Sequence, residues 1–393
     1  MTRTFGSSRR ALLVGVLVLA SAAGCASVGD AAGEPAEPSG VLAVVVGAHA
    51  NAPDPDLAGS AAAARDLAVA QQSYFSLVVA DGAPWQTDGF GPLLADGDTA
   101  AARAEQREDN RRRVDTSVEQ AAARVPETDL ITAMDLAVQT LPDESGVRTL
   151  VVVDSGLSTS GPLDFGRPGL LDADPVEVAD SLADTGSLPD LRGFSVVLQG
   201  LGVTTAPQQE LDPARRVRLV EIWKAVVQRA GAVAVVVETG PTDGPEEALP
   251  VVTPVPVDPG ISCVPGRITL TGGPLGFQPG EPLLSDRRAA TEALRPYAEQ
   301  MIADGDVIAE VFGTYAAVGD PAVRKSLSEL RAQEVAYVLI DLGVPIPQLH
   351  VAGLGSDWPG YVQDRDASGR FDPAAVARNR TVFLDLTEPL PCP

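Results

Sequence analysis

Histidine, cysteine and aromatic residues are scarce in this chain of 393 residues, which has 2 His, 3 Cys and 4% Phe, Trp and Tyr. Two histidines leave few ways to build a Ser-His-Asp arrangement. The sequence also lacks a C-x-x-C pair and a phosphate-binding loop of the G-x-x-x-x-G-K-[ST] form. We therefore expect a protein that is not an enzyme and that uses no cofactor.

Positive charge is scarce as well. The chain carries 29 Lys and Arg against 53 Asp and Glu, which gives a formal net charge of −24. Phosphate binding needs clustered Lys and Arg, and the arginine run at 111–113 lies among acidic residues, as on a solvated helix face. This composition argues against nucleic acid as a partner. It would also make an anionic membrane surface repel the body of the protein.

The apolar run at 11–20 is shorter than the roughly 20 residues that a membrane-spanning helix needs. It follows three arginines and precedes small residues and Cys25, an order typical of an export signal. This order resembles a bacterial lipobox, with Ala22 where Leu is commonest. The resemblance implies a lipoprotein signal peptide at 1–25, diacylation (palmitate) of Cys25, and a place on the outer face of the cell membrane.

An ordinary cleaved signal peptide, with Cys25 incidental, is the alternative to the lipoprotein signal. The general and twin-arginine export routes both stay open, because the residues around Arg9 and Arg10 also resemble a twin-arginine signal. Residues 26–39 are rich in Gly, Ala, Glu and Pro, and they are predicted to form a flexible tether.

The two remaining cysteines, Cys263 and Cys392, bracket the C-terminal part of the chain. Disulfides persist in exported proteins, and the two ends of a domain often lie close together. We predict that these two cysteines form a disulfide.

Residues 40–239 alternate between strand and helix patterns, which predicts a mostly parallel α/β sheet. Continuous apolar runs such as 41–46 are typical of strands that are buried on both faces. Strands are predicted at 41–46, 74–80, 149–153, 194–199 and 232–238, and helices at 61–71, 99–124, 129–141, 175–183 and 212–230.

Several turns of this region resemble a von Willebrand factor A-like domain, which has a Rossmann-like parallel sheet. The loop at 127–130 is similar to that family's Thr-bearing loop, and the strand end at 154–156 is similar to its T-D-G. The family's metal site also needs D-x-S-x-S, where this chain has Gly-Ala-His-Ala-Asn at 47–51. Thr128 and Asp154 are therefore degenerate metal candidates, and no working metal site is expected. The alternative for Thr128 is a helix N-cap.

A Ser-His-Asp set can be drawn in the same region from Ser155 or Ser158 with His49 and Asp154. Loops at the carboxyl ends of parallel strands share one edge of a sheet, so these residues can meet there. The residues around both serines lack the G-x-S-x-G elbow, and we expect no catalysis from them.

Residues 240–262 are dense in Pro and Gly, which predicts a semi-stiff linker with polyproline character. The boundary between two domains is placed here, and the second domain spans 263–393. Its strands are predicted at 267–270 and 307–312, its helices at 287–302 and 327–342, and its closing strand within 377–384.

The second domain resembles the OmpA-like peptidoglycan-binding module, which has an α+β fold. The helical motif L-S-x-x-R-A-x-x-V stands at 327–335, and the passages at 344–355 and 377–384 also match the family in order. In that family a loop Asp and the Arg of the helical motif hold the charged amino-acid end of the peptidoglycan stem peptide. Here Ala316 replaces the Asp, and Arg324 replaces an Asn.

The resemblance implies a remnant peptidoglycan site at Arg331, with Arg380 in support. Arg324 would repel an ammonium group and attract a carboxylate. Asp320 is a candidate substitute for the missing Asp if the loop is rearranged. The alternative for Arg331 is a structural salt bridge that holds the helix.

Together these observations predict a lipid-anchored protein of the bacterial cell envelope that tethers or organises the envelope. The membrane would lie at one end, with peptidoglycan or a protein partner at the other. Two alternatives stay open: a protein-interaction scaffold that has lost both ligand sites, and a metal-dependent adhesion-type binder that uses Thr128 and Asp154.

Overall fold

The computed structural model describes residues 38–142, 145–240 and 249–392, which fall in one compact unit. The signal peptide, Cys25 and most of the tether lie outside these ranges, so the expectations for them stay predictions. Within the described residues, no helix has both the length and the apolar character to cross a membrane.

The first sheet has seven strands in the order β3-β2-β1-β5-β6-β7, with β4 also paired to β2. Five of its strands run parallel, and β3 and β4 are antiparallel to β2. The strands are β1 (Val41–Val46), β2 (Tyr74–Val79), β3 (Trp85–Gln86), β4 (Gly91–Pro92), β5 (Arg148–Val153), β6 (Phe194–Gln199) and β7 (Ala234–Glu238). The predicted parallel sheet is confirmed; β3 and β4 are only two residues long, too short to give a pattern.

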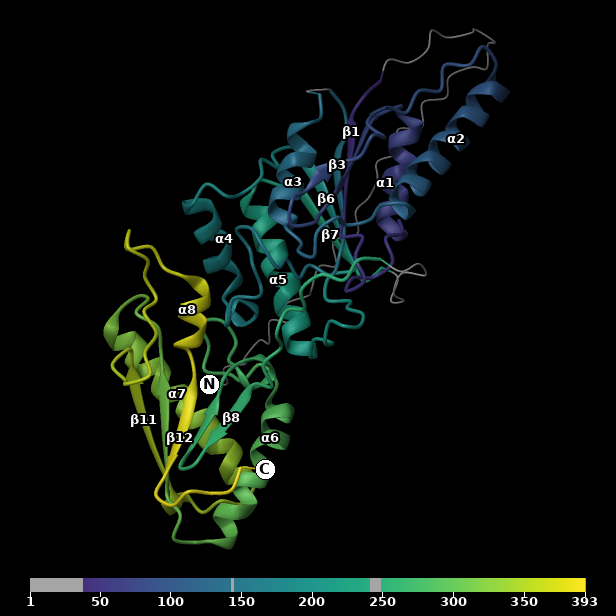
Figure 1. Cartoon of the computed structure of the whole chain (residues 1–393). Coiled ribbons are helices and arrows are strands. Elements are labelled where there is room, and N and C mark those ends of the chain that lie inside the picture. The colour runs from purple at the N-terminus through teal and green to yellow at the C-terminus, as the bar shows by residue number, and fades with distance from the viewer. Residues whose placement is uncertain (1–37, 143–144, 241–248, 393) are drawn as a thin grey trace, which may run out of the picture. The chain divides into compact units, whose positions relative to one another are not determined.

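Helices cover both faces of this sheet (Figure 1). One face packs against α1 (Gly59–Ala70) and α2 (Ala100–Glu119), and the other packs against α3 (Leu130–Gln139), α4 (Pro175–Asp184) and α5 (Pro213–Arg229). Residues along β1 alternate between the two cores, and all six are buried. Burial on both faces explains why this strand is a continuous apolar run.

The second sheet has five strands in the order β11-β10-β12-β9-β8. Only β10 and β11 are parallel. The strands are β8 (Ile261–Val264), β9 (Arg267–Leu270), β10 (Ala309–Thr314), β11 (Leu349–Gly355) and β12 (Val382–Leu386). Helices α6 (Arg287–Ala303) and α7 (Pro321–Asp341) share a hydrophobic core with this sheet.

Three elements of this second part differ from the prediction. Strand β8 was not predicted, and it begins at Ile261, within the expected linker. Helix α7 begins at Pro321 and not at residue 327, because Asp320 caps it by accepting from the Ala322 and Val323 N–H groups. The closing strand begins at Val382, since the residues before it form α8 (Pro373–Arg378).

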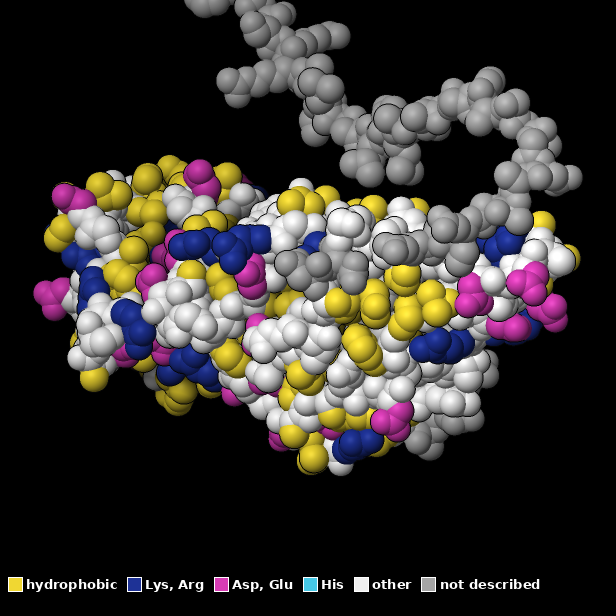
Figure 2. Space-filling model, turned by 90° about the horizontal axis from the view of Figure 1, so that it is seen from above, with side chains coloured by type: hydrophobic (Ala, Val, Ile, Leu, Met, Phe, Trp, Pro, Cys, Tyr) yellow, Lys and Arg dark blue, Asp and Glu magenta, His cyan; other side chains and the backbone are white. Residues whose placement is uncertain are grey.

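The surface mixes charges of both signs. Figure 2 shows Lys and Arg side chains interspersed with Asp and Glu side chains on one face of the molecule. On α2, Arg111 pairs with Asp66 and Glu108, and Arg112 pairs with Asp109. The arginine run at 111–113 therefore lies on a solvated, ion-paired helix face, as predicted.

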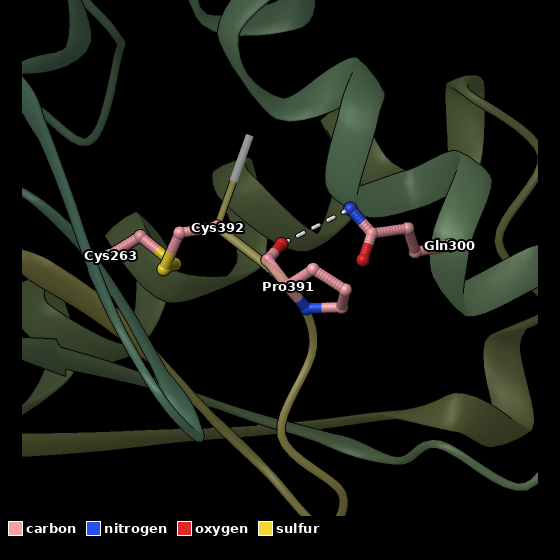
Figure 3. The surroundings of a disulfide bond; sticks show 4 residues. All are labelled: Cys263, Gln300, Pro391 and Cys392. Carbon is pink, nitrogen blue, oxygen red and sulfur yellow. Dashed lines mark hydrogen bonds between the residues drawn. A yellow bond between two sulfur atoms is a disulfide. The ribbon is translucent and has the colours of Figure 1, made fainter.

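The predicted disulfide joins Cys263 and Cys392, whose Cα atoms are 5.7 Å apart (Figure 3). Beside it, the Gln300 side chain of α6 donates a hydrogen bond to the Pro391 carbonyl oxygen at 3.3 Å. These contacts hold the end of the chain against the second sheet.

Replacing both cysteines by serine should lower the free energy of unfolding by about 4 to 5 kcal/mol, because the bridge closes a loop with a sequence separation of 129. Denaturant unfolding of wild type and of the double variant measures this difference. Each single Cys→Ser variant should lose as much as the double variant. Equal stability of wild type and double variant would contradict the prediction.

Candidate functional site

Helix α7 lies directly on β10 and β11, and two glycines allow this. A Cβ atom on Gly313 would lie 1.8 Å from the Ser328 carbonyl oxygen, and one on Gly353 would lie 2.5 Å from the Lys325 carbonyl oxygen. The Ser328 hydroxyl accepts a hydrogen bond from the Gly355 N–H at 3.0 Å. The Leu-Ser part of the helical motif thus fixes the helix, and Arg331 follows less than one turn later.

Arg331 is buried without a carboxylate. Arg331 is only 1% exposed to solvent, and it forms no ion pair with any described residue. Its Nε donates to the Glu281 carbonyl oxygen at 3.1 Å, and its Nη1 has no hydrogen-bond partner in the part of the chain that the structure describes. The rings of Phe277 and Tyr315 lie 5.0 and 5.1 Å from its guanidinium carbon. Burial lowers the pKa of Arg331 to about 10.

Among the described residues, Arg331 therefore does not form the structural salt bridge that was the alternative to a ligand site. Aromatic faces and one carbonyl oxygen offset part of the cost of burying the charge. The guanidinium nevertheless keeps an unused donor where an acceptor would fit.

Arg380 also lies near the Tyr315 ring, with its guanidinium carbon 5.1 Å from the ring centroid. Its two terminal nitrogens donate to the two carboxylate oxygens of Glu177, at 2.9 and 2.5 Å. Burial alone would lower the pKa of Arg380, but the hydrogen bonds and charge of Glu177 outweigh burial and raise it. Glu177 belongs to α4, so the first part of the chain contributes to this site.

Arg331 and Arg380 both line a cavity of about 40 Å³, enough for on the order of two or three water molecules. Its charged lining consists of Arg215, Arg218, Arg331, Arg380, Asp172 and Asp174. Arg215 is ion-paired with Asp172 and Asp212. Burial lowers the pKa of Arg218. An arginine-rich cavity of this kind can accept a carboxylate.

Two other residues proposed for the site, Asp320 and Arg324, lie outside the cavity. Asp320 is exposed and caps α7, so it does not replace the family's loop carboxylate beside Arg331. Arg324 does not line the cavity, and its Nε has no hydrogen-bond partner among the described residues. Ala316 is fully buried, and the next residue, Ala317, donates its N–H to Asp364 at 2.7 Å.

Sequence reasoning missed Glu177, Tyr315, and Arg215 and Arg218 of α5. Tyr315 immediately precedes Ala316, which was the one available signal. Glu177 lies 203 residues before Arg380, and no motif links two positions so far apart.

The other candidate site lies at the carboxyl ends of β1 and β5, where the chain switches direction across the sheet. His49 Nε2 lies 3.1 Å from Asp154 Oδ2, and both residues are buried. Asp154 Oδ1 accepts the Gly156 N–H at 2.6 Å. The imidazole therefore engages the carboxylate that a metal would need.

Thr128 donates its hydroxyl hydrogen to the Ala80 carbonyl oxygen at 2.6 Å, and it is Asp129 that caps α3. The suggested N-cap role of Thr128 is thus filled by its neighbour. In the ranges that the structure describes, no group of three or more His, Cys, Asp or Glu side chains could hold a metal ion.

The possible Ser-His-Asp set lacks its Ser-His contact. His49 Nδ1 has no hydrogen-bond partner among the described residues. The Ser155 hydroxyl lies near Asp154 at 3.4 Å, and the Ser158 hydroxyl accepts the Leu130 N–H at 3.2 Å. Neither serine is placed against the base that would activate it.

Part of the Pro-rich linker lies across this sheet edge. We call residues 250–255 the strap. The Asn51 amide pairs with both the N–H and the carbonyl oxygen of Val252, at 3.1 and 3.0 Å, and the Gln208 amide does the same for Val255, at 2.7 and 3.0 Å. Val252 and Val255 are each 2% exposed. The strap thus covers the position where open α/β sheets bind ligands.

No protein-family model matches the sequence, and no curated protein matches it. Similar solved structures include the peptidoglycan-associated lipoprotein from Burkholderia pseudomallei, at 21% identity over 29% of this chain and 94% of that chain, with a TM-score of 0.24. A MotB-like protein from Desulfovibrio vulgaris has 24% identity over 31% and 76%, with a TM-score of 0.24. The OmpA-like domain of FopA1 from Francisella tularensis has 18% identity over 33% and 80%, with a TM-score of 0.22.

Asn51→Ala should release the strap at Val252, because it leaves a buried N–H and a buried carbonyl without partners, at a cost of roughly 1–3 kcal/mol. Hydrogen exchange at the Val252 amide should become faster. Gln208→Ala is the matched control, since it acts first at Val255. Unchanged exchange at Val252 in Asn51→Ala would show that the amide does not hold the strap.

Proposed function

We propose that this chain is a non-catalytic protein of the cell envelope that binds a carboxylate of the peptidoglycan stem peptide through Arg331. The observation that carries the proposal is the Arg331 guanidinium, which is buried, lacks a carboxylate and keeps an unpaired Nη1 donor. A ligand carboxylate would supply a charge-assisted hydrogen bond at this point.

The ligand we propose is recognised by its carboxylate and not by an ammonium group. Ala316 offers no carboxylate for an ammonium, and Asp320 is used by the helix cap. The arginines that line the cavity favour an anion. The site would thus still bind the carboxylate at the charged amino-acid end of the stem peptide. It would no longer bind the ammonium group at that end.

Anchoring through a lipid on Cys25 completes the proposal, with a tether at 26–39 and domains at 40–239 and 263–393. The membrane would then hold one end and the wall the other. A protein partner for the first domain also belongs to this proposal, and so does its von Willebrand factor A-like identity. The second candidate function, a scaffold without wall binding, is favoured by the small volume of the Arg331 cavity.

Sedimentation of the purified full chain with peptidoglycan sacculi tests wall binding. Arg331→Ala should weaken binding roughly tenfold or more, because a hydrogen bond to a charged group contributes about 1.5–3 kcal/mol. Arg331→Lys should bind at an intermediate level, since it keeps the charge but loses the planar fork. Thermal unfolding of each variant shows whether the fold is kept.

Arg288→Ala is the matched control, because Arg288 is an arginine of the same module whose side chain is 88% exposed. It removes the same charge, so its binding should equal that of wild type. A wild type that stays in solution, or an Arg331→Ala variant that sediments equally well, would overturn wall binding and favour the scaffold.

Metabolic labelling with palmitate tests the anchor. Wild type should incorporate the label and remain with the membrane fraction, and Cys25→Ser should do neither, because the thiol is the acylation site in a lipobox. Incorporation of label into Cys25→Ser would contradict lipidation at this residue. Loss of the signal sequence without label in wild type would point to an ordinary cleaved signal.

A further inference from the structure

We propose that the ion pair of Glu177 with Arg380 keeps the Arg331 site closed. The inference rests on the proposed function, because it assigns a regulation to the same site. Its physical basis is that a carboxylate from the first part of the chain already pairs with Arg380, which lines the same cavity as Arg331.

The geometry of the pair supports this role. Glu177 holds Arg380 with two parallel hydrogen bonds, the arrangement that arginine also forms with a ligand carboxylate. Arg380 and Arg331 each lie 5.1 Å from the Tyr315 ring. Glu177 therefore pairs with an arginine that shares an aromatic neighbour, Tyr315, with the unpaired guanidinium.

The start of α4 presents this carboxylate. Asp174 caps the helix by accepting from the N–H groups of Val176 and Glu177, with Pro175 at the first helical positions. Acidic side chains are favoured in the first turn of a helix, so Asp174 and Glu177 lie together there. The charge of Asp174 also acts on Arg218 and Arg380.

Other contacts hold the closed arrangement. Asp172 accepts the Gly273 N–H at 2.7 Å, and Ala374 of α8 is buried in the core of the first sheet. The ion pair of Arg167 with Asp372, at 2.6 Å, has side chains that are 45% and 31% exposed, so it adds little. The Glu177 pair is less exposed, with 26% for Glu177 and 12% for Arg380.

Closure limits what can enter. A cavity of about 40 Å³ does not admit the end of a stem peptide, which is larger than two or three water molecules. Wall binding therefore requires α4 to move away from Arg380. The apparent affinity is then reduced by the fraction of molecules that are closed.

Glu177→Gln in the full chain should favour the open form, because it removes the charge that pairs with Arg380. The apparent Kd for sacculi should fall at least about fivefold, the lower end of ordinary coupling between sites. Adding Arg331→Ala to Glu177→Gln should abolish the gain. Asp180→Asn is the matched control: Asp180 lies on the same helix, pairs with Arg229 on the surface, and should leave the Kd unchanged.

Hydrogen exchange separates failure of this inference from failure of wall binding. Without sacculi, residues 170–180 and 373–380 should exchange faster in Glu177→Gln than in Asp180→Asn. Faster exchange with no sedimentation of any variant would overturn wall binding but keep the closing contact. Unchanged exchange, or an equal Kd for Glu177→Gln and wild type, would overturn the role of Glu177.

Discussion

Burying a charged guanidinium costs free energy unless other groups interact with it. The structure of the second module depends on the groups that interact with Arg331. Helix α7 can approach β10 and β11 so closely only because Gly313 and Gly353 lack side chains, and this approach buries Arg331. With alanine at position 316, the loop offers no carboxylate. Ring faces and one carbonyl oxygen compensate for Arg331, whereas Glu177 compensates for Arg380. The carboxylate that pairs with Arg380 thus comes from the first part of the chain and not from the module itself.

Helices and strands could be predicted because the sequence patterns that indicate them are local. Apolar runs predicted β1 and β6 with the bounds that the structure shows, and the order of the OmpA-like resemblance predicted β9. The site could be predicted only in part. Arg331 was indicated by a motif on one helix, but its neighbours come from α4, α5 and a loop, and only tertiary packing brings them together.

Asp320 illustrates the same limit. Its distance from Ala316 in sequence suggested a replacement carboxylate, but the stronger local requirement was a cap for the unpaired N–H groups at the start of α7. A short polar side chain before a proline serves that requirement well. An aspartate at this position fits a helix cap and a site carboxylate equally well in the sequence. Only the folded backbone shows that it is the cap.

Because the strap comes late in the chain, the first sheet can form before the strap covers its carboxyl edge. Asn51 and Val252 are 201 residues apart, and the strap follows every strand of the first sheet in the chain. When a chain is delivered from its N-terminus, the whole first sheet can form while its carboxyl edge is still open. A partner present at that moment would meet a surface that the finished molecule covers with its own residues 250–255.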